Sequence, residues 1–413
     1  MNSRDRILTA IDHKEPDRVP VDIGATPSSG ISLVAYQNLI KHIGMPHLKS
    51  YTYDVVQQVV QPEMEFIEHY GIDVVDIGRN FNQAPDYWHE LELIEGFPAL
   101  YPKWFDPLKQ KDNSWIAHNN RGEAIGRMPH GATFFDQIVF PYLDGYPDDY
   151  SQLSEAMNRS VWGGFGFTPW DWADRPDFWK MLRTKTLELK EQTDKALLLG
   201  VGCNLFEWGT FLRRMDNFLT DMFMYPDEVH RLLDALMDKH MDLLAKVCDS
   251  VGDIVDIVKF GDDFGMNSGP FIPVETYNEF FHHREKQMCN YVKNNSTMKT
   301  MLHSCGGIYE LIPGLIDAGF DILNPVQINA VNMEPERLKK EFGKDITFWG
   351  GGADTKSILN NAKPEKVKEH VLHNLEIFMK DGGFVFNTVH NIMPDVPPEN
   401  IEAMFEAINE FNN

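Results

Sequence analysis

Cysteine is scarce in this sequence. The 413 residues include only four cysteines, Cys203, Cys248, Cys289 and Cys305. A small secreted domain held together by disulfides carries many more cysteines for its length, so a disulfide framework is excluded. Cys203, Cys248 and Cys289 also lack the spacing that is typical of metal ligands. We therefore expect these three to be packed thiols in a reducing compartment.

Positive charge and long apolar runs are scarce as well. The chain has 38 Lys and Arg against 62 Asp and Glu, a formal net charge of −24. Proteins that bind nucleic acid or anionic membranes need clustered cations, so we expect neither partner. The longest apolar stretches, such as residues 196–201, are far shorter than the roughly 20 residues that span a bilayer. The N-terminus also lacks the apolar segment of a signal peptide, which predicts a cytoplasmic protein.

What the sequence does have is a regular alternation of strand-like and helical segments. Predicted strands cover residues 73–78, 196–202, 253–260, 298–304, 321–325, 346–350 and 384–388, and predicted helices cover 227–247, 274–293, 309–318, 334–342, 364–380 and 398–411. Such repeating units predict parallel strands joined by right-handed crossovers. Seven strands favour a (β/α)8 barrel. The sequence has neither a G-x-G-x-x-G motif nor a P-loop, which counts against the rival doubly wound sheet.

Residues 80–180 interrupt this alternation. They contain seven of the nine tryptophans, and a predicted β-hairpin turns at residues 119–122. One interpretation is an insertion that needs aromatic mass to bury itself. The other is an aromatic lid over a flat or methylated substrate. We predict a single TIM-barrel domain over residues 1–413 with an N-terminal extension, and with residues 80–180 as an aromatic-rich insertion. The sequence pattern does not locate the eighth strand, for which residues 80–180 have room.

A histidine and a cysteine stand where the strand over 298–304 ends. Side chains two apart on a strand point to the same face, so His303 and Cys305 converge at the rim where barrel active sites lie. His390 follows the last strand and reaches the same rim. Two imidazoles, one thiolate and one open position describe a catalytic zinc site, whereas a structural zinc has four protein ligands. The alternative is that His303 and Cys305 are simply packed side chains.

Further polar residues follow the ends of predicted strands. Glu207, Asp262 and Asp263 are candidate catalytic residues, each able to orient a histidine, complete the metal coordination or contact the substrate. The alternative for each is a loop carboxylate that caps the next helix. Substrate or corrinoid contacts are expected from three more residues, Gln327, Asp354 and Asn391.

Several motifs of the chain resemble the uroporphyrinogen decarboxylase superfamily. They begin with Arg4, Arg6 and the Asp17–Pro20 tetrapeptide near the N-terminus, and continue through Asp262-Asp263, His303-x-Cys305-Gly306, Asn324–Gln327, Phe348–Gly351 and Val389–Ile392. The resemblance covers nearly the whole chain and implies a (β/α)8 barrel. Within the superfamily, the cobalamin-dependent methyltransferase branch binds zinc through His-x-Cys and a distant cysteine. His303 and Cys305 match this pattern, and His390 stands at the third position.

A histidine in place of the distant cysteine at the third position changes the charge of the implied metal centre. Zn²⁺ with two thiolates is neutral, whereas one thiolate and two imidazoles leave a charge of +1, which stabilises a developing oxyanion better. The namesake decarboxylase acts on a polyanionic porphyrinogen and has arginines in its N-terminal segment. The matching residues 21–27 contain no arginine here, and the net charge is strongly negative.

Three functional hypotheses follow. The leading one is a zinc-dependent methyltransferase that moves a methyl group between a small methylated, typically methoxylated, compound and the cobalt of a corrinoid. The corrinoid (cobalamin) is carried by a separate protein, and the methyltransferase itself is a candidate homodimer. The second is a decarboxylase of a cyclic or tetrapyrrole acid, which needs no metal. The third is a barrel that binds a corrinoid or another ligand without catalysis.

Overall fold

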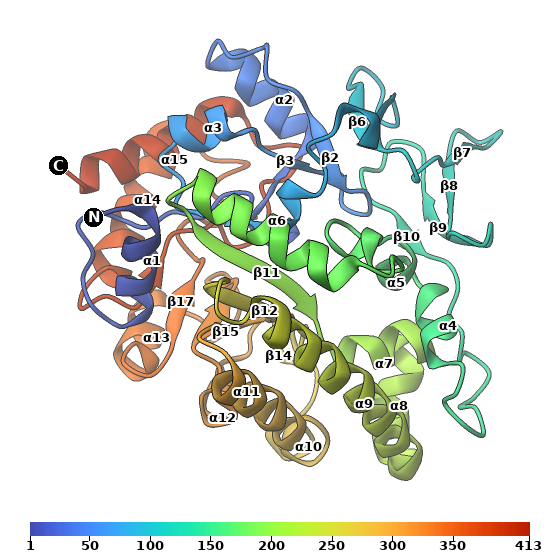
Figure 1. Cartoon of the computed structure of the whole chain (residues 1–413). Helices are drawn as coiled ribbons and strands as arrows, with labels where there is room; N and C mark the ends of the chain where they lie inside the picture. The colour runs from blue at the N-terminus through green and yellow to red at the C-terminus, as the bar shows by residue number, and fades with distance from the viewer.

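Parallel strands form the centre of the protein. In a computed structural model that describes residues 1–413, seven strands hydrogen-bond in the order β18-β17-β16-β15-β12-β11-β4 (Figure 1). These strands are β4 (Val74–Asp76), β11 (Ala196–Gly202), β12 (Ile257–Gly261), β15 (Lys299–His303), β16 (Ile322–Asn324), β17 (Thr347–Trp349) and β18 (Phe384–Val385). All six pairings are parallel. The predicted barrel class is therefore confirmed.

The barrel closes through the N-terminal segment. Val21 forms a parallel bridge with Phe386, just beyond β18, and the carbonyl of Val21 accepts a hydrogen bond of 2.8 Å from the amide of Asp73, just before β4. Residues 20–22 thus fill the eighth position, between the first and last strands of the sheet. Residues 80–180, named above as a region with room for the eighth strand, do not contribute it. An isolated bridge of this kind has no period of its own in the sequence.

Helices connect the strands and cover the outside of the barrel. The main ones are α6 (Phe178–Gln192), α7 (Phe206–Arg213), α8 (Met215–Met224), α9 (Pro226–Val251), α10 (Val274–Tyr277), α11 (His283–Asn295), α12 (Ile312–Ala318), α13 (Pro335–Phe342), α14 (Pro364–Phe378) and α15 (Pro398–Phe411). Proline opens α9, α13, α14 and α15, where the missing amide proton costs no intrahelical bond. No helix combines the length and the apolar character needed to cross a membrane.

The barrel interior is apolar at one end and polar at the other. Helix α1 (Ser3–Ile11) closes the apolar end with Ile7, Ala10 and Ile11. Each of the seven strands adds at least one side chain to the same buried cluster: Val74, Ala196, Leu198, Ile257, Met301, Ile322, Trp349 and Val385. Side chains alternate along a strand, so the next inward positions are two residues further on. These are Asp76, Gly200, Lys259, His303, Asn324, Gly351 and Asn387. The apolar layer supports a polar layer above it.

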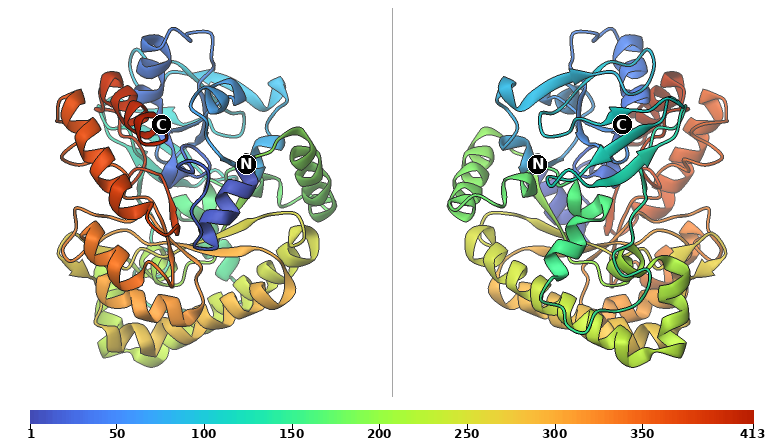
Figure 2. Two further views of the ribbon diagram at one scale, coloured as in Figure 1. Left: turned by 90° about the vertical axis from the view of Figure 1, so that its left-hand side faces the viewer. Right: turned by 90° about the vertical axis from the view of Figure 1, so that its right-hand side faces the viewer.

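Two smaller sheets lie beside the barrel. A five-stranded sheet contains β1 (Ile31–Ser32), β2 (Tyr51–Asp54), β3 (Val59–Gln61), β5 (Trp88–Leu91) and β6 (Ala99–Pro102). A four-stranded sheet contains β7 (Leu108–Lys109), β8 (Trp115–His118), β9 (Ala124–Met128) and β10 (Asp136–Gln137). The predicted hairpin is confirmed as the antiparallel pair β8–β9. Figure 2 shows both sheets on the same side of the barrel as the helices α2 (Leu33–His42) and α3 (Met64–His69).

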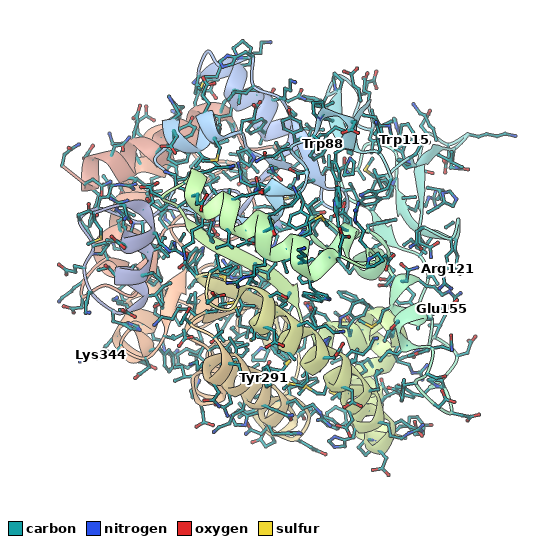
Figure 3. The ribbon with its side chains drawn as sticks, in the orientation of Figure 1. Trp88, Trp115, Arg121, Glu155, Tyr291 and Lys344 are labelled. Carbon is teal, nitrogen blue, oxygen red and sulfur yellow. The ribbon has the colours of Figure 1, made fainter.

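The tryptophans of the inserted region have different environments. Trp88, labelled in Figure 3, is buried and donates from Nε1 to the Asn82 carbonyl at 2.7 Å. Trp104 and Trp162 are exposed. Trp170 donates from Nε1 to the Gly200 carbonyl at 2.7 Å, which ties the insertion to the end of barrel strand β11. The insertion therefore buries part of its aromatic surface in itself and places another part against the barrel mouth.

Candidate metal centre at the barrel mouth

The carboxyl ends of the strands surround an opening. Asp76, Lys259 and His303 each lie at an inward position near the end of their strand, and each is partly exposed although the positions directly before and after it are buried or nearly so. Cys305 and His390, which follow β15 and β18, are also partly exposed. Solvent therefore reaches these side chains only in part, and they lie at the carboxyl ends of the strands, where active sites of this fold lie.

His303, Cys305 and His390 come together in this opening. One ligand atom from each residue lies within 4.8 Å of the other two. The Cys305 Sγ and the His303 Nε2 are 3.4 Å apart, and the two imidazole centroids are 5.7 Å apart. Two nitrogens and one sulfur at these separations can converge on one tetrahedral ion and leave a fourth position free. The donor set fits zinc.

Asn324 determines which nitrogen of His303 is free. The Asn324 amide group donates from Nδ2 to the Trp349 carbonyl at 2.9 Å, which directs its Oδ1 toward His303. This oxygen lies 2.8 Å from His303 Nδ1 and can only accept. Nδ1 therefore carries the proton, and Nε2 keeps a lone pair that points toward Cys305. A hydrogen bond on the other ring nitrogen is the usual way in which proteins orient a metal-binding histidine.

His390 is oriented in the same way. Its Nδ1 lies 2.9 Å from Asn391 Oδ1, and Asn391 Nδ2 donates to Gln57 Oε1 at 3.4 Å. Asn391 thus acts on the neighbouring histidine, and the predicted contact between Asn391 and a substrate stays a prediction. The two histidines have matching arrangements, each with an asparagine oxygen on Nδ1 and a free Nε2.

The protonation states of the three residues also suit a metal. Burial lowers the pKa of His303 to about 3, with a further contribution from the Lys259 ammonium. Burial also lowers the pKa of His390. Both imidazoles are therefore neutral near pH 7. Burial, together with the charge of Asp263, raises the pKa of the Cys305 thiol well above its usual value, so the thiol keeps its proton until a cation replaces it.

Two of the predicted carboxylates lie beside the centre. Asp263 accepts the Cys305 amide proton at 2.8 Å, and its Oδ1 lies 3.6 Å from His303 Nε2. Glu207 accepts from Asn204 Nδ2 at 2.5 Å, and its charge is among the causes that raise the pKa of the Cys305 thiol. Burial and the nearby charges of Asp263 and Asp262 raise the pKa of Glu207 well above its usual value. Glu207 therefore holds a proton more readily than a free glutamate.

Asp262 has a different local role. Its two carboxylate oxygens accept the amide protons of Leu205, Phe206 and Glu207 at 2.7, 3.0 and 2.8 Å, at the start of α7. A carboxylate in this position satisfies amides that have no partner inside the helix. These bonds favour the interpretation of Asp262 as a helix cap. Its predicted catalytic role is not needed to explain its position.

The remaining predicted residues form bonds within the loops of the rim. Gln327 accepts from the Gly306 amide at 2.8 Å and donates to Asn267 Oδ1 at 2.7 Å. Asp354 accepts from Asn329 Nδ2 at 2.6 Å and from the Lys356 amide at 2.7 Å. Gln327 therefore supports the glycine turn that follows Cys305. Asp354 supports a loop that follows β17.

Lys259, Asp22 and Asp76 are further polar side chains of the barrel mouth that the sequence analysis does not predict. Burial raises the pKa of Asp22 to about 6 and that of Asp76 to about 7. The signal for Lys259 was available, because a lysine interrupts an otherwise apolar strand at an inward position. The signal for Asp22 was not, because it depends on the closure of the barrel by residues 20–22.

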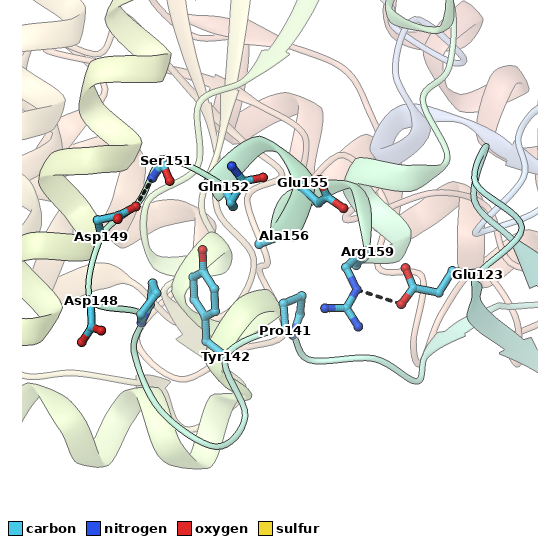
Figure 4. Close-up of a pocket in the computed structure, with 11 residues that line it drawn as sticks. Glu123, Pro141, Tyr142, Asp148, Asp149, Ser151, Gln152, Glu155, Ala156 and Arg159 are labelled. Atoms are coloured by element: carbon cyan, nitrogen blue, oxygen red, sulfur yellow. Dashed lines mark hydrogen bonds and ion pairs between the residues drawn. The ribbon is translucent and has the colours of Figure 1, made fainter.

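A separate cleft lies in the inserted region (Figure 4). It has a volume of about 590 Å³ and is lined by Glu123, Pro141, Tyr142, Pro147, Asp148, Asp149, Ser151, Gln152, Glu155, Ala156 and Arg159. Arg159 and Glu123 form an ion pair of 2.8 Å across it, and Asp149 accepts from the Ser151 amide. None of the residues of the metal centre lines this cleft.

Replacement of Asn324 by alanine is expected to lower zinc affinity about 10- to 100-fold, because His303 loses the bond that fixes its ring. Competition with a chelator measures this effect. Asn360→Ala, in the surface turn before α14, is the matched control and should leave the affinity unchanged. Equal affinities in wild type and Asn324→Ala would show that Asn324 does not orient a metal ligand.

The fold and the geometry define a (β/α)8 barrel protein with an N,N,S ligand set at its mouth. The family model "Uroporphyrinogen decarboxylase (URO-D)" matches residues 200–411, and the chain belongs to this family.

Similar proteins include two named uroporphyrinogen decarboxylase. The one from Ruthia magnifica is 28% identical over 194 residues, which cover 46% of this chain and 52% of that protein. The one from Methylococcus capsulatus is 25% identical over 229 residues, which cover 53% and 61% of the two chains. The chain thus spans less than two thirds of the length of these curated relatives. A solved methyltransferase from Methanosarcina mazei covers 100% of both chains with a TM-score of 0.60 and 16% identity, a similarity that shows the fold.

Proposed function

We propose that this protein is a zinc-dependent methyltransferase that transfers a methyl group between a small methoxylated or similarly methylated compound and the cobalt of a corrinoid. The observation that carries the proposal is the convergence of His303, Cys305 and His390 within 4.8 Å at the barrel mouth. A metal-free decarboxylase gives no reason for three soft and borderline ligand atoms to meet there. The structural similarity to a methyltransferase is compatible with this function.

The residues of the centre have separate tasks in this proposal. Asn324 and Asn391 hold the two imidazoles with their Nε2 atoms free, and Cys305 supplies the single thiolate. A zinc ion held by these residues would act as a Lewis acid on the heteroatom that carries the methyl group. Glu207 holds a proton beside the centre and can donate a hydrogen bond to the demethylated heteroatom. The open side of the barrel mouth is where a corrinoid protein would present its cobalt.

Zinc binding at pH 7 is expected to release about one proton per ion. The release of one proton follows from the pKa values of the three ligands. The two histidines have lowered pKa values and are already neutral, whereas the Cys305 thiol has a raised pKa and must lose its proton. The apparent affinity should therefore rise about tenfold per pH unit between pH 6 and 8. Calorimetry in buffers of different ionisation enthalpy measures the proton count. Release of two or more protons would contradict the assigned protonation states.

The decarboxylase remains the second candidate because the curated relatives carry that name. Two features of the mouth count against a polyanionic porphyrinogen. Residues 21–27 contain no arginine, and Asp22 in this segment turns its carboxylate into the barrel, where Trp349 Nε1 donates to it at 2.9 Å. Lys259 is the one lysine of the inward polar layer, which also contains Asp22 and Asp76. A substrate with many carboxylates would find one cation there.

A pair of assays separates the two candidates. The zinc-loaded protein is incubated with cob(I)alamin and a panel of methoxylated compounds, and methylcobalamin is followed by its absorption. In parallel, it is incubated with uroporphyrinogen, and the carboxylates lost are counted. We expect methylation of the cobalt and no decarboxylation. Decarboxylation without methyl transfer would establish the second candidate, and inactivity in both assays over a broad panel would leave a binding protein.

A further inference from the structure

Lys259 is a cation without an ionic partner inside the barrel. It lies on β12, facing inward, and its ammonium donates one hydrogen bond of 2.8 Å, to the hydroxyl of Ser28. No carboxylate oxygen lies within 4.0 Å of it. An ammonium group has three N–H donors, so two of them have no acceptor from the protein. Lys259 is only partly exposed, so a bound anion would stabilise its ammonium, and this chain supplies no carboxylate in contact with it.

The acids around Lys259 are engaged elsewhere. Asp22 accepts from Trp349 Nε1 at 2.9 Å and from the Ala25 amide at 3.1 Å. Asp76 accepts from the Gly78 amide at 2.6 Å. Burial raises the pKa of both carboxyls, to about 6 and about 7, so each holds less negative charge near neutral pH than a free aspartate. The Lys259 pKa is lowered to about 8 by burial, so its ammonium form persists at pH 7.

Lys259 belongs to the same polar layer as His303, and its backbone lies two residues behind that of His303 in the strand register. In the pairing of β12 with β15, Lys259 is opposite Met301 and Gly261 is opposite His303. Two residues along a strand correspond to about 6.6 Å, and neighbouring strands are about 4.8 Å apart. Ser28, which accepts from Lys259, also donates to Asn324 Oδ1 at 3.4 Å, the oxygen that orients His303. The free donors of Lys259 and the metal ligands thus face the same interior space.

We propose that Lys259, held in place by its hydrogen bond to the hydroxyl of Ser28, forms an anion subsite that binds a carboxylate of the methylated substrate. This inference rests on the proposed function, since it places the carboxylate at the Lys259 ammonium and the methyl-bearing heteroatom at the metal centre. The ammonium bonds to Ser28, whose hydroxyl donates to the Asn324 oxygen that orients His303, so the anion subsite adjoins the metal centre. The substrate class is therefore a small methoxylated acid with a single anionic group. A neutral methoxylated compound would leave the ammonium without a partner.

Direct binding tests this subsite without a catalytic readout. The zinc-loaded wild type, Lys259→Met and Lys259→Gln are titrated by calorimetry with 3-methoxybenzoate, 4-methoxybenzoate and methoxyacetate, and with the three corresponding amides. The amides match the acids in shape and lack the charge. We expect the wild type to bind at least one acid about tenfold or more tightly than its amide, as a charge-assisted pair predicts. Both variants should lose this preference and bind the amide as the wild type does.

The matched control is Lys299→Met. Lys299 begins the neighbouring strand β15 and pairs with Asp12 at 2.9 Å, at the opposite end of the barrel, so this variant removes the same charge away from the mouth. It should keep the preference for the acid. Zinc content and thermal unfolding establish that each variant is folded and loaded.

Three outcomes would overturn the subsite: a wild type that binds every acid no better than its amide, a Lys259 variant that keeps the preference, or an equal loss in Lys299→Met. The outcome is independent of methyl transfer. Acid preference that depends on Lys259 in a protein without methyltransferase activity would support the subsite and refute the proposed function. Methyl transfer without any dependence on Lys259 would support the proposed function and refute the subsite.

Discussion

Replacement of Cys305 by alanine is expected to reduce bound zinc from about one equivalent to a trace and to lower methyl transfer by about a thousandfold or more. Cys305 is the only thiolate donor of the centre, and its Sγ lies 3.4 Å from His303 Nε2. Without it, two neutral imidazoles remain, which bind zinc far more weakly. The loss should appear together in metal analysis and in the cob(I)alamin assay, because both depend on the same ion.

Cys248→Ala is the control for this experiment. Cys248 is a buried thiol on α9, outside the ligand set, so zinc content and activity should stay at the wild-type level. A Cys305→Ala variant that retains a full equivalent of zinc would refute the ligand assignment. A variant that loses zinc and keeps full activity would refute the role of the metal in the reaction.

The second large effect concerns stability. Replacement of Asp73 by alanine is expected to lower the free energy of unfolding by about 3 kcal/mol, because it breaks a buried ionic network. Asp73 is fully buried and accepts from Arg6 Nη1 at 2.7 Å, from Arg18 Nη2 at 2.8 Å and from the Val21 amide at 3.0 Å. The carboxylate thus attaches the eighth position of the barrel to the segment before β4. Its removal leaves two cations and one amide short of an acceptor.

Urea unfolding followed by fluorescence measures this loss. Asp253→Ala removes an exposed ion pair with Arg183 and serves as the comparison, with an expected effect below about 1 kcal/mol. If Asp73→Ala and Asp253→Ala have the same small effect, the network of Asp73 does not hold the barrel closed.

Much of the barrel could be predicted from local sequence patterns. The strand at Ala196–Gly202 and the helix at Pro398–Phe411 have the predicted bounds, because a continuous apolar run and a proline-initiated amphipathic helix are strong local signals. The meeting of His303, Cys305 and His390 could also be predicted, since the carboxyl ends of parallel strands share one rim. The sequence therefore predicts that these three side chains meet at the mouth, and the structure brings them within 4.8 Å of one another.

Other features depend on tertiary structure that leaves no local pattern. The eighth position of the barrel consists of a single bridge at Val21, too short for any period to reveal it. Asp262 and Asp263 are adjacent in the sequence, yet one caps α7 and the other lies beside His303. Their roles differ because side chains of neighbouring residues point in different directions at the end of a strand. The orientation of His303 by Asn324 likewise depends on the Trp349 carbonyl, 25 residues further along the chain.

The central claim is that the N,N,S centre at the barrel mouth performs methyl transfer through a bound metal. The most direct test compares one protein sample in three states: as purified, stripped of metal by a chelator, and reconstituted with one equivalent of zinc. Each state is assayed for methylation of cob(I)alamin by a methoxylated donor. We predict activity in the first state, its loss in the second and its recovery in the third. Activity that persists in the metal-free protein, at the level of the reconstituted one, would contradict the claim.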